Sequence, residues 1–184
     1  TMKGRTFKGP RGLSGKPSHP PLTDVPIAAY LIAAVFDVIS TIAGDGRAWA
    51  DELWHAGTYL FIAGVIVSVF AALTGLADAR DSSEAGTQAR RTINTHAAIM
   101  VTVTVLALIN LAWRLSQFNV AAATPVAIAV LSVVIALLVS LGATFGGSLV
   151  FEYGFNVETA GDHPVWHQSE TDVFPGEEHP AADG

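Results

Sequence analysis

Two polar residues inside long apolar runs are the first candidates for chemistry. Asp37 lies eleven residues after Pro26, about 16 Å along a helix and near the middle of a membrane. Asn110 lies at a similar depth in a later run. Ionisable residues inside membranes are rare, and they carry ions or protons or pair with other polar groups. Asp37 is predicted to face the protein interior, where it either carries a proton or forms a structural hydrogen bond to Asn110. In either role we expect Asp37→Asn to preserve the fold.

Imidazole groups form the second candidate site. The chain contains six His and no Cys, which excludes disulfides, thiolate-bound metals and covalent c-type haem attachment. His96 opens the third apolar run and His19 precedes the first, so both could lie on one side of a membrane and bind a b-type haem. A capping or headgroup-level role for His96 is the alternative. His55 opens the second run on the opposite side and cannot share an iron with His96.

Patterns typical of other cofactors and of hydrolytic enzymes are missing from the sequence. His163 and His167 have i, i+4 spacing, but Pro164 and polar neighbours favour an extended tail over a metal-binding helix. There is no nucleophile elbow, phosphate-binding loop or zinc-binding HExxH. We therefore predict no catalytic residues and no metal-ion site, and haem b is the one cofactor left open.

Four long apolar runs must position these side chains. A membrane core of about 30 Å needs about 20 mostly apolar residues to cross it, and each run is long enough. Only α-helices satisfy the backbone groups of such runs, which are far longer than the strands of a membrane barrel. The predicted fold is all-α, an integral membrane four-helix bundle with spans at about 25–44, 56–77, 96–115 and 124–151.

Charges are confined to the ends and connections, and they predict the orientation. Residues 1–24 form a basic arm with five Lys and Arg, and residues 152–184 form an acidic tail with eight acids and no Lys or Arg. The arm and the 78–95 connection together hold eight Lys and Arg, against Arg47 and Arg114 on the other side. Lys and Arg collect on the cytoplasmic side, so both termini are predicted to be cytoplasmic. A basic arm beside a membrane indicates contact with the lipid bilayer and no nucleic acid.

Aromatic and small residues fit the same arrangement. The predicted outer boundary holds Trp49, Trp54, Trp113 and Phe118, and the inner one holds Phe151, Tyr153 and Phe155. Gly142 and Gly146 form a GxxxG motif, with Gly147 offset by one residue. Such motifs let helices approach closely, and we predict packing within the bundle in preference to a dimer contact.

Several short motifs in this order resemble a bacterial membrane protein family called domain of unknown function 2231. The resemblance covers about residues 18–157, and its motifs lie at 18–26, 72–78, 90–96 and 146–154. It implies a four-helix domain of the bacterial plasma (inner) membrane that is fused in some relatives to Rieske or cytochrome c domains, and hence a role in electron transfer. His19 and Pro20 match the family's entry motif, but Asp24 stands where the family has a second His.

Three functions follow as hypotheses. The favoured one is a non-enzymatic membrane subunit that anchors or docks with other membrane or redox protein subunits through its acidic tail. The first alternative is a small b-type cytochrome with haem near His19 and His96. The second is a proton or small-solute carrier built on Asp37 and Asn110.

The charge count predicts a topology that reporter fusions can test. A reporter after Gly184 and one in the 78–95 connection should be cytoplasmic, while one in the 45–55 connection should be external. Because four spans put the 78–95 connection and the C-terminus on the same side, an external C-terminal signal beside a cytoplasmic one from the 78–95 connection would contradict the four-span arrangement.

Overall fold

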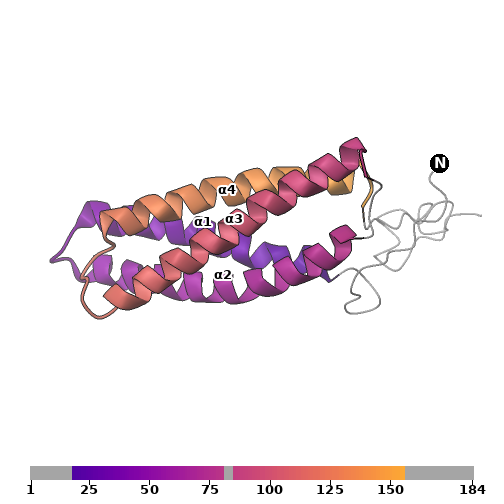
Figure 1. The fold of residues 1–184 in the computed structure, drawn as a ribbon. Helices are drawn as coiled ribbons and strands as arrows, with labels where there is room; N and C mark the ends of the chain where they lie inside the picture. Colours follow the sequence, from indigo (N-terminus) through magenta and orange to yellow (C-terminus); the bar gives the residue numbers. More distant parts are fainter. Residues whose placement is uncertain (1–17, 81–84, 156–184) are drawn as a thin grey trace, which may run out of the picture.

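The computed structural model describes residues 18–80 and 85–155, and these form four α-helices without a strand (Figure 1). Each helix is long and apolar enough to cross a membrane, which confirms the predicted all-α four-helix fold. The helices are α1 (His19–Ala43), α2 (Ala48–Arg80), α3 (Gln88–Gln117) and α4 (Val126–Phe151).

The first three helices begin before the apolar runs that predicted them. α1 starts at His19 because Pro20 and Pro21 occupy its first turn, where a missing N–H breaks no helical hydrogen bond. His19 is therefore the first helical residue, whereas the sequence placed it ahead of the span. α3 starts at Gln88 because the Thr87 hydroxyl accepts a hydrogen bond from the Arg90 N–H at 3.2 Å.

Successive helices run in opposite directions and pack as the four corners of a bundle (Figure 1). The α1–α2 and α3–α4 connections lie at one end, called here the connection end, and the described chain begins and ends at the other, the terminal end. Each helix packs against two neighbours, and no Cα atoms of the diagonal pairs α1–α3 and α2–α4 come within 8 Å among the described residues. Long side chains are needed to join diagonal helices.

Small residues allow α1 and α2 to approach closely in the middle of the bundle. A Cβ atom at Gly64 would lie 2.7 Å from the Tyr30 ring, so this contact requires glycine. Tyr30 is fully buried, shares a hydrogen bond of 2.8 Å with the Ser68 hydroxyl, and packs against Phe61 with ring centroids 5.2 Å apart. Valine, alanine and isoleucine side chains complete this core: Ala33, Val65, Val103, Ala107, Ile135 and Val139.

Two of the three glycines predicted for helix packing lie against α3. A Cβ atom at Gly142 would lie 2.5 Å from the Met100 sulfur, and one at Gly146 would lie 3.1 Å from Cε1 of His96. The corresponding atom at Gly147 would meet only Phe151 of its own helix, at 4.0 Å. The GxxxG motif thus packs α4 on α3 within the chain, and Gly147 takes no part in that contact.

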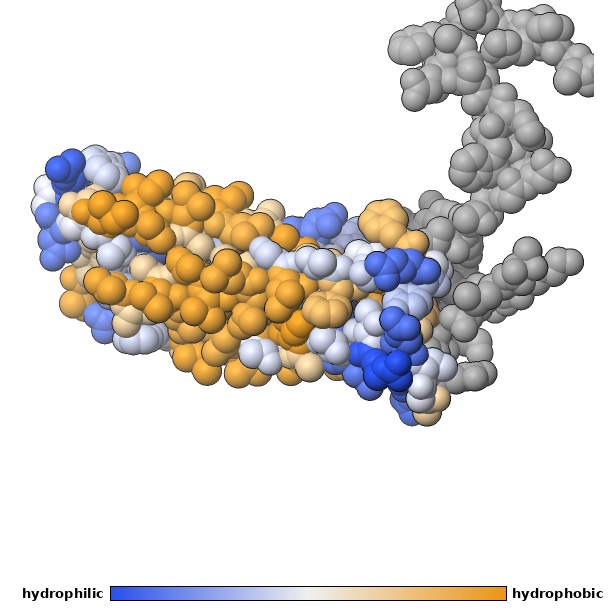
Figure 2. Space-filling model, turned by 90° about the horizontal axis from the view of Figure 1, so that it is seen from above, coloured by the Kyte–Doolittle hydropathy of each residue, from blue (hydrophilic) through white to orange (hydrophobic). Residues whose placement is uncertain are grey.

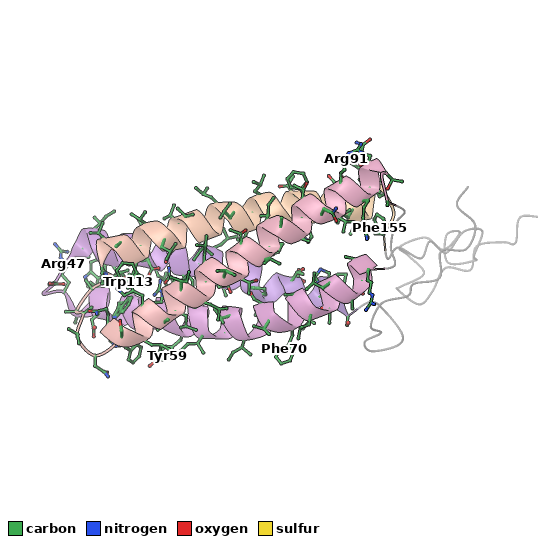
Figure 3. All side chains as sticks on the ribbon, viewed as in Figure 1. Arg47, Tyr59, Phe70, Arg91, Trp113 and Phe155 are labelled. Atoms are coloured by element: carbon green, nitrogen blue, oxygen red, sulfur yellow. The ribbon has the colours of Figure 1, made fainter. Side chains whose placement is uncertain are left out.

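The outer surface is a band of apolar side chains between hydrophilic ends (Figure 2). Tyr59 and Phe70 project outward from α2, and both are more than half exposed (Figure 3). Arg47 and Trp113 lie toward the connection end, while Arg91 and Phe155 lie at the terminal end (Figure 3). An apolar surface of this extent is covered by lipid in an integral membrane protein.

Candidate functional site

A buried ion pair joins two diagonal helices near the connection end. Asp37 of α1 and Arg114 of α3 are both fully buried, and Nη2 of Arg114 donates to Oδ2 of Asp37. The long arginine side chain makes this contact between helices whose Cα atoms stay more than 8 Å apart. Two opposite charges therefore meet inside the bundle.

The remaining donors of the Arg114 guanidinium bind the other helices. Nε donates to Oδ1 of Asn110 at 2.7 Å, and Nη1 donates to the Thr58 hydroxyl of α2 at 3.3 Å. Nη2 also donates to the Ser132 hydroxyl of α4 at 3.0 Å. Ser132 accepts a further hydrogen bond of 3.1 Å from Nδ2 of Asn110. The guanidinium thus links all four helices.

The carboxylate of Asp37 is tied in turn to the α3–α4 connection. Its Oδ1 accepts a hydrogen bond of 3.2 Å from the Thr124 hydroxyl. The Thr124 N–H donates to the Ser40 hydroxyl at 2.9 Å, and that hydroxyl donates to the Ala50 carbonyl at 2.7 Å. The Thr41 hydroxyl donates to the Thr124 carbonyl at 2.8 Å. The connection end is held by one continuous hydrogen-bonded network.

Aromatic rings and a glycine shape the space around the pair. Cζ of Arg114 lies 4.2 Å from the ring centroid of Phe61 and 5.2 Å from that of Trp54, at distances of cation–π contacts. A Cβ atom at Gly57 would lie 3.0 Å from Oδ1 of Asp37, so glycine leaves room for the carboxylate. Trp54, which was predicted at the membrane boundary, does not face lipid headgroups, because its ring is fully buried beside Arg114.

The site differs from its sequence-based prediction in the partner of Asp37. Asp37 faces the interior and lies six residues, or about 9 Å, before the end of α1, halfway between that end and the middle of the helix. It makes no direct hydrogen bond to Asn110 in the described structure, because Arg114 lies between them. The spacing of Arg114 from His96 and Asn110 places all three on one face of their helix, but it does not by itself indicate that Arg114 pairs with Asp37.

The new partner also changes the expectation for Asp37→Asn. A neutral amide at position 37 would leave the Arg114 cation buried without its counter-ion, so we no longer expect the substitution to be neutral. The arrangement is chemically suited to fixing four helices in one register. Two charges that compensate each other and are held by several hydrogen bonds suit a proton carrier poorly.

The two histidines predicted for haem lie at the terminal end. Nδ1 of His19 is 2.9 Å from the Ala71 carbonyl of α2 and 3.3 Å from the Thr74 hydroxyl. Nδ1 of His96 is 2.9 Å from the Gly142 carbonyl of α4. Both rings are partly buried between helices. His163 and His167 lie outside the described residues.

His55 lies far from this pair, as its position in the sequence predicted. Its Nδ1 contacts Oδ1 of Asp51 at 3.2 Å, and its ring packs edge-on against Phe118 with centroids 4.6 Å apart. Ala71, which binds His19, is sixteen residues further along α2, or about 24 Å. An open cavity of about 500 Å³ lies beside His55 at the connection end. Within the described residues, no group of three or more His, Cys, Asp or Glu could hold a metal ion.

The bundle and its lipid-facing surface define a class, that of four-span integral membrane proteins. Comparison with known families gives a more specific assignment. A family described as "Predicted membrane protein (DUF2231)" matches residues 15–159, and the chain belongs to this family. No curated protein and no solved structure gives a match.

The buried ion pair generates a stability prediction. Arg114→Leu should lower the free energy of unfolding in detergent by about 3 to 5 kcal/mol, because it leaves the Asp37 carboxylate buried without a cation. Arg47→Leu, which removes an exposed arginine at the same end, should change it by less than about 0.5 kcal/mol. Equal free energies of unfolding of the two variants, measured by denaturant titration, would show that the ion pair does not stabilise the bundle.

Proposed function

We propose that the protein is a non-enzymatic membrane subunit that anchors or docks a redox complex. The observation that carries this proposal is the closed network around Arg114, which bonds to groups on all four helices. Such a network favours one fixed arrangement of the bundle, as a scaffold requires. A fixed bundle with an apolar outer band can hold a partner at a defined depth in the membrane.

The link to electron transfer rests on the family resemblance. Relatives that carry a Rieske or cytochrome c domain on the same four-helix unit imply that the unit holds such domains at the membrane. In this chain the acidic tail, residues 152–184, follows the last helix and is the candidate contact for a separate partner. Its eight acids without Lys or Arg favour a basic partner surface.

The carrier hypothesis has less support. A carrier needs a group that exchanges its proton or ion with water on each side, and Asp37 and Asn110 are both fully buried and held by hydrogen bonds. Secondary transporters also use broken helices at their binding sites, whereas α1 to α4 are each continuous. Pro26 lies inside α1 without ending it.

Native purification tests the subunit function. The tagged protein, extracted from its own membranes in mild detergent, should migrate with proteins that carry redox cofactors, detected by iron content and visible absorption. Replacing the acids of residues 156–184 by their amides should release these partners while the bundle keeps its helical content. The matched control replaces Asp45 and Glu52 at the opposite end, which should leave the complex intact.

Two outcomes would contradict the proposal. One is a protein that purifies without redox-active partners at every detergent concentration that preserves its fold. The other is proton uptake into liposomes by the protein alone, followed with a pH-sensitive dye. Uptake that disappears in Asp37→Asn, while that variant keeps its helical content and its elution volume in gel filtration, would establish the carrier function in its place.

A further inference from the structure

In α1 and in α3, a histidine at one end and a charged residue near the other end are separated by the same number of residues. Asp37 follows His19 by eighteen residues in α1, and Arg114 follows His96 by eighteen residues in α3. Eighteen residues make about five helical turns, or about 27 Å, so each histidine lies on the same face of its helix as the charged residue. α1 and α3 run in the same direction (Figure 1). The ion pair between Asp37 and Arg114 therefore brings His19 and His96 to one depth on facing sides of these helices.

The contacts of the two rings agree with this register. His19 lies against Gly75, five residues before the end of α2, and His96 lies against Gly146, five residues before the end of α4. Two histidines from diagonal helices thus lie at the same level of the bundle.

Hydrogen bonding determines which ring nitrogen of His19 and of His96 can bind a metal. A carbonyl oxygen can only accept, so Nδ1 of His19 must donate to Ala71, and Nδ1 of His96 must donate to Gly142. In a neutral imidazole the proton on Nδ1 leaves a lone pair on Nε2. Metal-bound histidines commonly donate their second ring nitrogen to a backbone carbonyl in this way, which fixes the ring orientation. In each ring, Nε2 is therefore the nitrogen whose lone pair can bind a metal.

A glycine lies beside each ring. A Cβ atom at Gly75 would lie 2.6 Å from Cε1 of His19, and one at Gly146 would lie 3.1 Å from Cε1 of His96. These glycines let each imidazole lie directly against the neighbouring helix. His19 and His96 thus have the same local environment: each ring packs against a glycine, and each Nδ1 donates to a backbone carbonyl.

The ligand set points to an iron porphyrin in preference to a bare ion. Structural zinc takes four protein ligands, and the described residues supply no group of three or more candidates. Haem iron needs only two axial ligands, because the porphyrin supplies four nitrogens. The neighbouring side chains Ile99 and Met100 are apolar, as a porphyrin face requires.

We propose that His19 and His96 are the axial ligands of one b-type haem, bound between α1 and α3 at the terminal end of the bundle. Asp24, which replaces a histidine of the family's entry motif, is exposed on α1 and is not needed for this pair. The site would give the protein one-electron chemistry of its own. It goes beyond the anchoring role and does not depend on it, because the isolated chain should bind haem whether or not a redox complex is attached.

Absorption spectroscopy on the full chain tests the site. The protein, produced with a haem precursor supply or titrated with hemin in detergent, should bind one haem per chain and show the low-spin bands of two imidazole ligands after reduction by dithionite. His19→Asn and His96→Asn should each abolish these bands, because the Asn amide can still donate to the carbonyl but offers no Nε2. His55→Asn should leave the bands unchanged.

The glycines supply an independent pair of variants. Gly75→Ala, whose methyl group displaces the His19 ring, should weaken hemin affinity at least tenfold, while Gly147→Ala should leave it unchanged. This comparison decides the question even where a histidine variant does not fold, as judged by circular dichroism and gel filtration. A folded protein that binds no hemin, a spectrum that survives both histidine substitutions, or equal hemin affinity of the two glycine variants would overturn the proposal. Binding of zinc without binding of hemin would also overturn the proposal.

Discussion

The arrangement of this bundle depends on one buried ion pair. Removing the charges of Asp37 and Arg114 from water costs several kcal/mol for each ion, and their attraction offsets this cost only when the remaining polar atoms are also bonded. Here the guanidinium binds Asn110, Thr58 and Ser132, and the carboxylate binds Thr124. A shift of any helix by one residue would break part of this set. The ion pair therefore selects one register for all four helices, whereas their apolar surfaces alone would permit several.

The ion pair between Asp37 and Arg114 also determines the relative positions of His19 and His96 at the terminal end. In a membrane, apolar side chains gain little by moving from lipid into a bundle, so helix depth must be set by specific contacts. Asp37 and Arg114 set the depth of α1 against α3, although these helices do not touch through their backbones. His19 and His96 then occupy matching positions about five turns away. A fixed connection end and two histidines at one level of the terminal end are thus two results of one constraint.

Hydropathy alone was sufficient to predict the four helices and their order, because lipid requires long apolar runs and continuous backbone hydrogen bonding. It gave the bounds of the apolar runs and not those of the helices, since α1 extends back through Pro20 and Pro21, which fit a first helical turn. It placed Trp54 at the boundary because tryptophan is common there, but it did not indicate that the ring is buried beside the Arg114 guanidinium.

Arg114 was the residue that sequence reasoning could have assigned and did not. A count of charges by loop treats an arginine at a helix end as exposed, yet its side chain is long enough to reach a carboxylate across the bundle. The signal was the equal spacing of His19 to Asp37 and of His96 to Arg114, which links two helices that are far apart in the sequence. The contacts of the two histidines with Gly75 and Gly146 could not be foreseen, because they depend on how neighbouring helices are rotated.

A double-mutant cycle on Asp37→Asn and Arg114→Gln tests most directly whether the two charges act as one unit. Each single variant should lower the free energy of unfolding in detergent, because each leaves one buried charge without its counter-ion. The double variant should be less destabilised than the sum of the two, with a coupling energy of about 1 to 3 kcal/mol. Additive losses, with a coupling energy near zero, would contradict the claim that this pair sets the register of the bundle.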